Sequence, residues 1–241
     1  MKKSARNASS NEKPDVMFRV HGQIVRPDAA LVAQLAKVPV ANLSDACGNL
    51  HTMDSGIQAM YPAARICGPA CTVSTRGGDF VATLIGLGVA QAGDVLVIDN
   101  QGKNDTALWG EITTAEAQRK GLAGLLVDGN VRDIEGIRKR EFPVFARGTV
   151  PRVVGRTSLG EVNVPIQCGG VVVEPGDIVV GDADGVVVVP KEKAEEVLRL
   201  GLEIVDYENK LLDKVLKGMT QIEMFSIQEQ FEALLKGHIK H

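Results

Sequence analysis

The sequence predicts a single α/β domain built in three layers, two of strands and one of helices (β/β/α). In the middle of the chain, short apolar runs alternate with capped helical segments, which is the pattern of successive βα units. The segment that follows is rich in β-branched and turn residues, which predict hairpins. A chain of 241 residues can bury one sizeable core, so we expect one such domain.

Three regions are expected along the chain. Residues 1–26 form a polar N-terminal arm and lead-in, residues 27–190 form the α/β domain, and residues 191–241 form C-terminal helices. The arm has charges but no apolar centre, so it does not have the pattern of a signal peptide. The C-terminal helices carry apolar stripes that require a partner surface, so we expect them to make oligomer contacts.

Local signals define each element in turn. Residues 27–38 read as an amphipathic helix with proline in its first turn, and residues 66–75 as a strand of small and β-branched residues. The helix at 111–120 begins with an acidic residue and ends in basic residues before a glycine, as capped helices do. The remaining helices are expected at 42–47, 81–90, 134–140, 191–218 and 222–235. The remaining strands are expected at 94–99, 122–128, 142–146, 161–166 and 171–189, the last containing two hairpin turns, at 175–177 and 182–185.

Composition excludes several classes of protein. The net charge of −3 gives no reason to expect nucleic acid as a partner. No apolar run approaches the ~20 residues that span a membrane, so we expect no membrane partner. The four cysteines form no Cys-x-x-Cys pair and make no zinc-ligand spacing with the four histidines. Free thiols and a cytoplasmic location follow as expectations.

The candidate site lies between Gly110 and Asp133. Glu111 is the first residue of the helix at 111–120. The strand at 122–128 ends in the turn residues 128–130, and Arg132 and Asp133 follow this turn, directly before the next helix. Open α/β sheets place ligands at the carboxyl ends of their strands, so a helix start and a strand end can meet there across one crevice. We expect these residues to face one another.

The residue types at this crevice suit a 2-oxo acid. A helix N-terminus offers N–H donors to an anion, and the planar fork of Arg132 matches a carboxylate or an enolate oxygen. Asp133 and Glu111 are hard oxygen ligands of the kind that Mg²⁺ prefers. An arginine–aspartate pair at a strand-to-helix turn is also the ordinary arrangement of a helix cap with a surface ion pair. Spacing alone leaves both interpretations open.

The motif of Glu111, twenty intervening residues, and Arg132-Asp133 resembles the signature of a known family. It is similar to that of the 4-hydroxy-4-methyl-2-oxoglutarate aldolases, a branch of the proteins related to the regulator of ribonuclease E activity A. The resemblance covers roughly residues 31–211, and it includes further blocks at 93–97, 124–129, 142–147, 162–165, 175–180 and 182–189. It implies the swivelling type of β/β/α domain.

The resemblance also implies an activity. The family cleaves a 4-hydroxy-2-oxo diacid, such as 4-hydroxy-4-methyl-2-oxoglutarate or 4-carboxy-4-hydroxy-2-oxoadipate, to pyruvate and a second 2-oxo acid. It decarboxylates oxaloacetate as a side reaction and requires Mg²⁺ or Mn²⁺. By this resemblance the catalytic residues are Arg132, Glu111 and Asp133. The substrate-binding residues are Arg132, Gly110, Glu111, Ile112, Thr113 and Asp79.

The metal ligands and the assembly are likewise implied by the resemblance. Asp133 would bind the metal directly, and Glu111 and Glu208 would bind it through water. Glu208 would come from the adjacent subunit of a homotrimer, and two trimers would pair into a hexamer. The alternative for Glu208 is an ordinary surface glutamate on the long C-terminal helix.

One departure and several alternatives keep the substrate open. Phe80 replaces an asparagine that is common in the family, which removes a polar group beside Asp79. Arg147 is also a candidate for binding a distal carboxylate, although solvated charge or a subunit contact is the favoured explanation. The chain could instead be a lyase or hydrolase on another 2-oxo or hydroxy acid, or a non-catalytic regulator of ribonuclease E. A methyltransferase is disfavoured because no glycine-rich turn of the doubly wound type follows the first strand.

Overall fold

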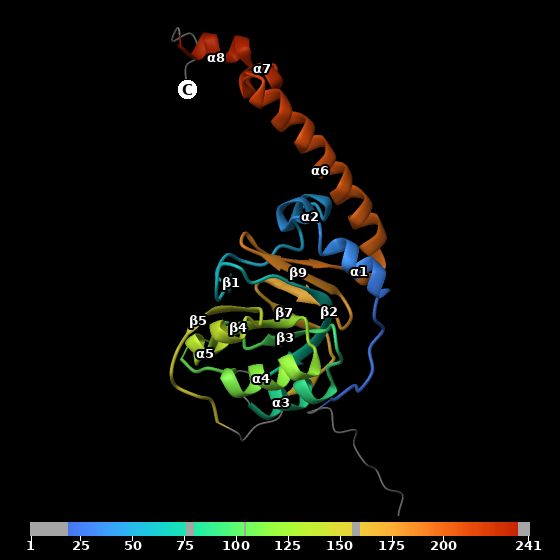
Figure 1. The fold of residues 1–241 in the computed structure, drawn as a ribbon, viewed down its shortest axis with the longest axis vertical. Helices are drawn as coiled ribbons and strands as arrows, with labels where there is room; N and C mark the ends of the chain where they lie inside the picture. The colour runs from blue at the N-terminus through green and yellow to red at the C-terminus, as the bar shows by residue number, and fades with distance from the viewer. Residues whose placement is uncertain (1–18, 76–79, 104, 156–159, 236–241) are drawn as a thin grey trace, which may run out of the picture.

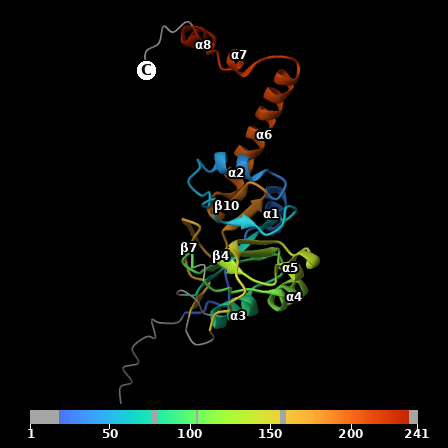
Figure 2. The same ribbon diagram turned by 90° about the vertical axis from the view of Figure 1, so that its left-hand side faces the viewer.

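A computed structural model describes residues 19–75, 80–103, 105–155 and 160–235 of the chain. Its body consists of strands enclosed between two groups of helices, and one long helix extends away from it (Figure 1). The turned view shows the same separation between the body and the projecting helix (Figure 2). The expected α/β domain is therefore present, and it carries a helical extension at its C-terminal end.

The main sheet has eight strands and is a nearly closed barrel. Its order is β1-β5-β4-β3-β2-β9-β10, with β6 beside β2. Strands β2, β3, β4 and β5 run parallel to one another, whereas β1, β6, β9 and β10 pair in antiparallel fashion. Thr52, just before β1, bridges to Val187 of β10, which brings the two ends of the sheet together. The bounds are β1 (Gln58–Ala59), β2 (Ile66–Ser74), β3 (Val95–Asp99), β4 (Gly124–Val131), β5 (Val144–Thr149), β6 (Glu161–Val162), β9 (Ile178–Asp182) and β10 (Gly185–Val189).

The helices cover both sides of this sheet. Helices α3, α4 and α5 pack on the parallel strands, and α1, α2 and the start of α6 pack on β9 and β10 (Figure 1). A separate antiparallel pair, β7 (Ile166–Cys168) and β8 (Val171–Val173), adds to the inner layer. The helix bounds are α1 (Ala29–Leu35), α2 (Val40–Ala46), α3 (Phe80–Val89), α4 (Glu111–Lys120), α5 (Ile134–Arg140), a 3₁₀ turn (Lys191–Lys193), α6 (Ala194–Leu216), α7 (Gln221–Met224) and α8 (Gln228–Leu235).

Alternation of apolar side chains along the strands explains the layers. In β3, Leu96 and Ile98 pack against the helices, whereas Val95 and Val97 point into the barrel. All four are fully buried, because helices cover one face of the strand and the barrel interior covers the other. Continuous apolar runs of this kind are what parallel strands require.

The strand β4 is longer than the sequence predicts. The turn expected at residues 128–130 does not form, and β4 continues to Val131 with an irregular register between Val127 and Asn130. The chain turns instead at Asp133, which adopts a left-handed conformation with φ 57°. Pairing of this segment with β5 and a bridge from Ala107 to Asn130 outweigh the local preference for a turn. Arg132 therefore directly follows the last residue of the strand.

Other predicted boundaries are also corrected. Helix α1 is shorter than 27–38 because Asp28, which accepts a hydrogen bond from the Ala30 N–H, caps it and leaves the proline outside. No hairpin forms at 175–177, since β8 pairs with β7 while β9 pairs with β2 and β10. The helix expected at 222–235 is two helices, separated near Ser226, whose φ is 55°.

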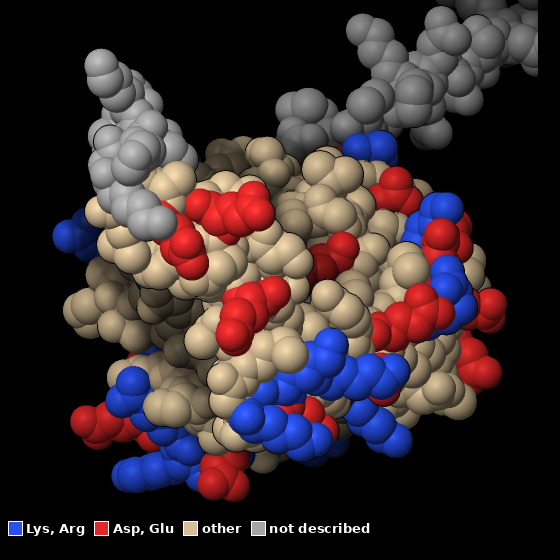
Figure 3. Space-filling view, turned by 90° about the horizontal axis from the view of Figure 1, so that it is seen from above, with Lys and Arg blue, Asp and Glu red and all other residues tan. Residues whose placement is uncertain are grey.

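Charge and cysteine chemistry are unremarkable in the described residues. Acidic and basic side chains are interspersed on the face shown in Figure 3, in line with the small net charge. All four cysteines are free thiols, and burial raises the pKa of Cys67 and of Cys71 to about 12. Within the described ranges no helix is both long enough and apolar enough to cross a membrane.

Candidate active site

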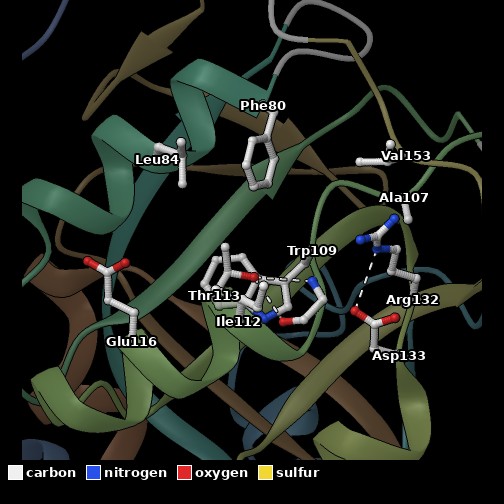
Figure 4. Close-up of a pocket in the computed structure, with 11 residues that line it drawn as sticks. Phe80, Leu84, Ala107, Trp109, Ile112, Thr113, Glu116, Arg132, Asp133 and Val153 are labelled. Atoms are coloured by element: carbon white, nitrogen blue, oxygen red, sulfur yellow. Dashed lines mark hydrogen bonds and ion pairs between the residues drawn. The ribbon is translucent and has the colours of Figure 1, made fainter.

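A pocket of about 190 Å³ lies between α3, α4 and the carboxyl end of β4 (Figure 4). It is small beside the ~300–1,000 Å³ of sites for drug-sized ligands, so its size suits a small metabolite. One end is polar and is formed by Gly110, Thr113, Arg132 and Asp133. The pocket therefore contains most of the residues that the sequence analysis named.

Gly110 allows the Asp133 carboxylate to approach the N-terminus of α4. A Cβ at residue 110 would lie 2.5 Å from Oδ2 of Asp133, which is closer than atoms can approach. The main-chain N–H of Glu111 donates a hydrogen bond to the same oxygen at 3.2 Å. Asp133 makes no side-chain cap on its own helix, α5, so it interacts with the preceding helix instead. Asp133 thus occupies the N-cap position of α5, but its side chain caps α4 instead of its own helix.

Hydrogen bonds hold the first turn of α4 in place. The indole N–H of the buried Trp109 donates to the Thr114 hydroxyl at 2.7 Å, and that hydroxyl donates to the Gly110 carbonyl at 2.9 Å. The Gly110 N–H donates to the Thr113 hydroxyl at 3.1 Å. Because these groups are partnered and largely buried, the helix N-terminus has a defined position relative to Asp133.

Arg132 is tied to the same turn by its backbone and leaves its side chain at the pocket. Its N–H donates to the Trp109 carbonyl at 2.9 Å. Its guanidinium Nε lies 3.5 Å from Asp133 Oδ2, which is too long for a strong hydrogen bond. The side chain is 39% exposed and faces the carboxylate across the polar end of the pocket (Figure 4). The guanidinium is therefore available to bind an anion.

The Glu111 side chain takes a different direction from the one expected. Its carboxylate accepts two hydrogen bonds from Arg140, at 3.2 Å from Nε and 3.1 Å from Nη2, and does not line the pocket. It lies over Gly136 of α5, where any Cβ would collide with the carboxyl group. Only the backbone of Glu111 therefore takes part in the polar end of the pocket.

Two further predicted site residues are not in this pocket. Glu208 belongs to α6, on the opposite side of the sheet from α4, and accepts a hydrogen bond from Asn42 Nδ2 at 2.6 Å (Figure 1). Within one chain it cannot reach the pocket. Asp79 lies outside the described residues. Ile112, in contrast, lines the pocket beside Thr113.

Sequence reasoning missed most of the apolar wall of the pocket. Phe80 and Leu84 come from α3, Ile112 from α4, and Val153 from the segment after β5. Glu116 also lines the pocket, and its spacing of four residues from Ile112 places both on one helix face. That spacing is a signal that could have identified Glu116. No local signal connects Phe80 with Val153.

Asp133 fits a hydrated divalent cation. Mg²⁺ in proteins commonly keeps several waters and uses one or two carboxylates together with oxygens of the substrate. Among the described residues no group of three or more His, Cys, Asp or Glu side chains could hold a metal ion. At the polar end of the pocket the donor is thus the carboxylate of Asp133, beside an arginine that suits the substrate anion, and Glu116 is a second carboxylate among the described lining residues.

Arg147 belongs to a separate cluster. Its guanidinium pairs with Asp54, with Nη2 2.8 Å from Oδ2, and its Nε donates to Asp128. The hydrogen bond from Arg147 holds the pKa of Asp54 below its ordinary value, and the two carboxylates raise the pKa of Arg147. Arg147 and Asp128 line a different depression, with Asp99 and Gln101. Arg147 is therefore no partner for a ligand in the pocket of Arg132.

The comparisons with known proteins indicate one family. The family model RraA-like (Aldolase/RraA) matches residues 40–188. A protein of Halalkalibacterium halodurans, assigned provisionally as a 4-hydroxy-4-methyl-2-oxoglutarate aldolase, is 41% identical over 168 residues, which are 70% of this chain and 80% of that protein. An uncharacterised protein of Pseudomonas syringae has a similar structure, with TM-score 0.73 and 30% identity over 82% of this chain and 97% of that one.

A second solved structure carries a regulatory description. RraAS2 of Streptomyces coelicolor, described as an unusual member of the RNase ES inhibitor RraA protein family, has a TM-score of 0.70 at 30% identity. The match covers 82% of this chain and 100% of that chain. The family model spans more than half of this chain, and both structures share its fold. The chain therefore belongs to the RraA-like family.

Proposed function

We propose that this protein is a divalent-metal-dependent pyruvate aldolase that cleaves the C3–C4 bond of a 4-hydroxy-2-oxo acid. The observation that carries the proposal is the meeting of Arg132 and Asp133 at the N-terminus of α4, in a pocket where Gly110 leaves room for the carboxylate. The provisional assignment of the relative from Halalkalibacterium halodurans supports the same reaction class. Decarboxylation of oxaloacetate is proposed as a side activity, because it passes through the same pyruvate enolate.

The chain's own groups would bind the 2-oxo acid end of the substrate. Arg132 and the N–H groups of Ile112 and Thr113 in the first turn of α4 would hold its negative oxygens. Asp133 would hold Mg²⁺ or Mn²⁺, which when bound supplies a Lewis acid that polarises the 2-oxo group. The hydrogen bond from the Glu111 N–H would keep the Asp133 carboxylate in position. If the Glu111 carboxylate were to bind the metal through water, it would have to do so while also accepting hydrogen bonds from Arg140.

Cleavage is a retro-aldol step. The C4 hydroxyl loses its proton to a pocket carboxylate or to a water that such a carboxylate orders, and Asp133 and Glu116 are the described carboxylates there. C4 becomes a carbonyl as the C3–C4 bond breaks, and the bonding pair forms the enolate of C3 and C2. Arg132 would stabilise the negative charge on the C2 oxygen, and a proton added at C3 completes pyruvate.

The test is pyruvate release from a panel of 4-hydroxy-2-oxo acids and from oxaloacetate. We expect pyruvate with Mg²⁺ or Mn²⁺, its loss with EDTA, and its return when the metal is restored. Borohydride added during turnover should trap no adduct, because the proposed route uses no Schiff base. Failure to release pyruvate from every member of the panel with either metal would overturn the proposal.

A second candidate is a regulator of a ribonuclease E-type enzyme, which the description of RraAS2 favours. The discriminating assay adds this protein to such a ribonuclease and follows RNA cleavage. If the protein is a regulator, the wild type and the Arg132→Ala variant should inhibit RNA cleavage to the same extent. An aldolase without regulatory function would leave cleavage unchanged in both forms.

A further inference from the structure

We propose that the group attached at C4 of the substrate is uncharged and apolar, so that the enzyme prefers a monocarboxylic 4-hydroxy-2-oxo acid to the diacids that the sequence resemblance implies. This inference rests on the proposed function, because it concerns the same pocket. It is carried by the division of that pocket into one polar end and one apolar wall (Figure 4).

The apolar wall stands where the far end of the substrate would lie. With the 2-oxo acid bound at Arg132 and Asp133, the rest of a short substrate extends toward Phe80, Leu84 and Val153. The Phe80 ring points into the pocket from α3, and Leu84 stands one helical turn further along (Figure 4). Leu84 is 41% exposed and Val153 is 50% exposed. An apolar substituent would cover these side chains and remove their apolar surface from water.

The distribution of charge disfavours a second carboxylate. Among the described residues that line the pocket, Arg132 is the only cation, and the first carboxylate would occupy it. Glu116 lines the opposite side of the pocket and would repel a further negative charge. Arg147, the other candidate for a distal carboxylate, is engaged with Asp54 and Asp128 in another depression. Within the part of the chain that the structure describes, a distal carboxylate in this pocket would therefore lose water without gaining a cationic partner.

The first test compares two substrates that differ only in the C4 group. In 4-hydroxy-2-oxoglutarate that group is a carboxylate, and in 4-hydroxy-5-methyl-2-oxohexanoate it is an isopropyl group of similar shape. Both release pyruvate, with glyoxylate and 2-methylpropanal as the respective second products. We expect kcat/KM to be at least about tenfold higher for the isopropyl substrate. Equal values, or a preference for the diacid, would overturn the inference while leaving the aldolase proposal intact.

A matched pair of variants tests the role of the wall. Val153→Arg places a cation beside the pocket, whereas Val172→Arg places one on another exposed valine, 62% exposed, that does not line it. Val153→Arg should shift the ratio of kcat/KM values toward the diacid by about tenfold, and Val172→Arg should leave the ratio unchanged. An equal shift in both variants would show that net charge, rather than the wall, sets the preference, and would contradict the inference.

A binding measurement separates failure of the inference from failure of the proposed function. Neither 2-oxoglutarate nor 5-methyl-2-oxohexanoate has a C4 hydroxyl, so neither can be cleaved by a retro-aldol step. Calorimetric titration of each into the protein with Mg²⁺ should give tighter binding for the isopropyl compound, and Phe80→Asn should reduce the difference. Tighter binding of 2-oxoglutarate would overturn the inference even if no substrate were ever cleaved.

Discussion

At the scale of single residues, the site depends on how closely one carboxylate approaches one helix. Gly110 has an extended backbone with φ −155°, which any residue can adopt, so its role is the space that it leaves rather than its flexibility. Asp133 fills that space and adopts a left-handed conformation that aspartate tolerates better than most residues do. Strained backbone of this kind is common at functional sites, which agrees with the role proposed for Asp133.

Replacement of Arg132 by alanine should remove most of the activity. If Arg132 stabilises the enolate charge, its loss should lower kcat/KM by about 10²–10³-fold. Arg132→Lys keeps the charge but loses the planar fork, so it should recover only part of the activity. The unfolding midpoint should hardly change, because the side chain is 39% exposed. A fully active Arg132→Ala enzyme would contradict the assignment.

Gly110→Ala should impair catalysis through a steric effect alone. The new Cβ would lie 2.5 Å from Asp133 Oδ2 and would displace that carboxylate from the helix terminus. Misplacement of a catalytic group by about 1 Å can cost about 10²-fold in rate. Gly88→Ala is the matched control, since a Cβ there has nothing within 4 Å and the residue lies within α3. The control should keep full activity and gain up to about 1 kcal/mol of stability; equal kinetics for both variants would refute the steric role.

The direction of the Glu111 side chain could not be predicted from the sequence, although the position of the residue could. Its place at the start of a helix was predictable from local signals. Its pairing with Arg140 depends on how α5 packs against α4, and on Gly136 lacking a side chain there. The two helices are separated by a whole strand, so no local pattern encodes that contact.

At the scale of elements, the unit α4–β4–α5 forms the framework of the site. The bounds of both helices agree with the sequence prediction, because α4 ends at Gly121 in the left-handed conformation and carries charges that suit its dipole. The strand β4 was predicted to end three residues too early. Its extension past Asp128 depends on pairing with β5, which is a tertiary contact.

The cluster of Asp54, Arg147 and Asp128 joins the segment before β1 to β5 and β4, and it should make stability depend on pH. Arg147 holds the pKa of Asp54 below its unfolded value, so this pair stabilises the fold at pH values above that unfolded pKa, near 4. The contribution is lost as the pH falls through the lower, folded pKa. Asp54 is 46% exposed at its side chain, so solvent screening keeps the effect small, at most about 1 kcal/mol.

Asp54→Asn is the variant that tests this pH dependence. It should lower the free energy of unfolding at pH 7, and the curves for the variant and the wild type should converge at pH values below the folded pKa of Asp54, where the carboxylate is protonated in both states. Urea unfolding at a series of pH values measures the difference. A difference that stays constant down to the lowest pH would rule out titration of Asp54 as its source.

At the scale of the whole molecule, contacts within a single chain do not explain why α6 projects from the body. It extends away from the body, and α7 and α8 lie at its far end (Figure 1). These three helices expose large apolar side chains that one chain does not cover, among them Leu216 at 75%, Phe225 at 60% and Leu235 at 72%. Apolar surface of this extent is typical of contacts between subunits, and we propose the trimer or hexamer implied by the family resemblance.

Subunit complementation tests the proposed role of Glu208 at a neighbour's site. Arg132→Ala and Glu208→Gln enzymes should each be nearly inactive, because each lacks one group in every site. Mixed oligomers, formed by unfolding and refolding the two together, should regain activity, since some of their sites would contain both intact groups. Light scattering checks the assembly. Absence of recovery in oligomers shown to be mixed would place Glu208 outside the site, as an ordinary surface glutamate held by Asn42.

The sequence by itself determined the α/β class, the two helices that flank the site, and the joining of Arg132 and Asp133 to one strand end. These features depend on caps, apolar periodicity and neighbouring residues, which act over a few positions of the chain. Only the tertiary structure decided that Asp133 turns to α4, that Glu111 turns to Arg140, and that Phe80 and Val153 form one wall. Those contacts join residues distant in the chain, and packing of whole elements determines which of them form.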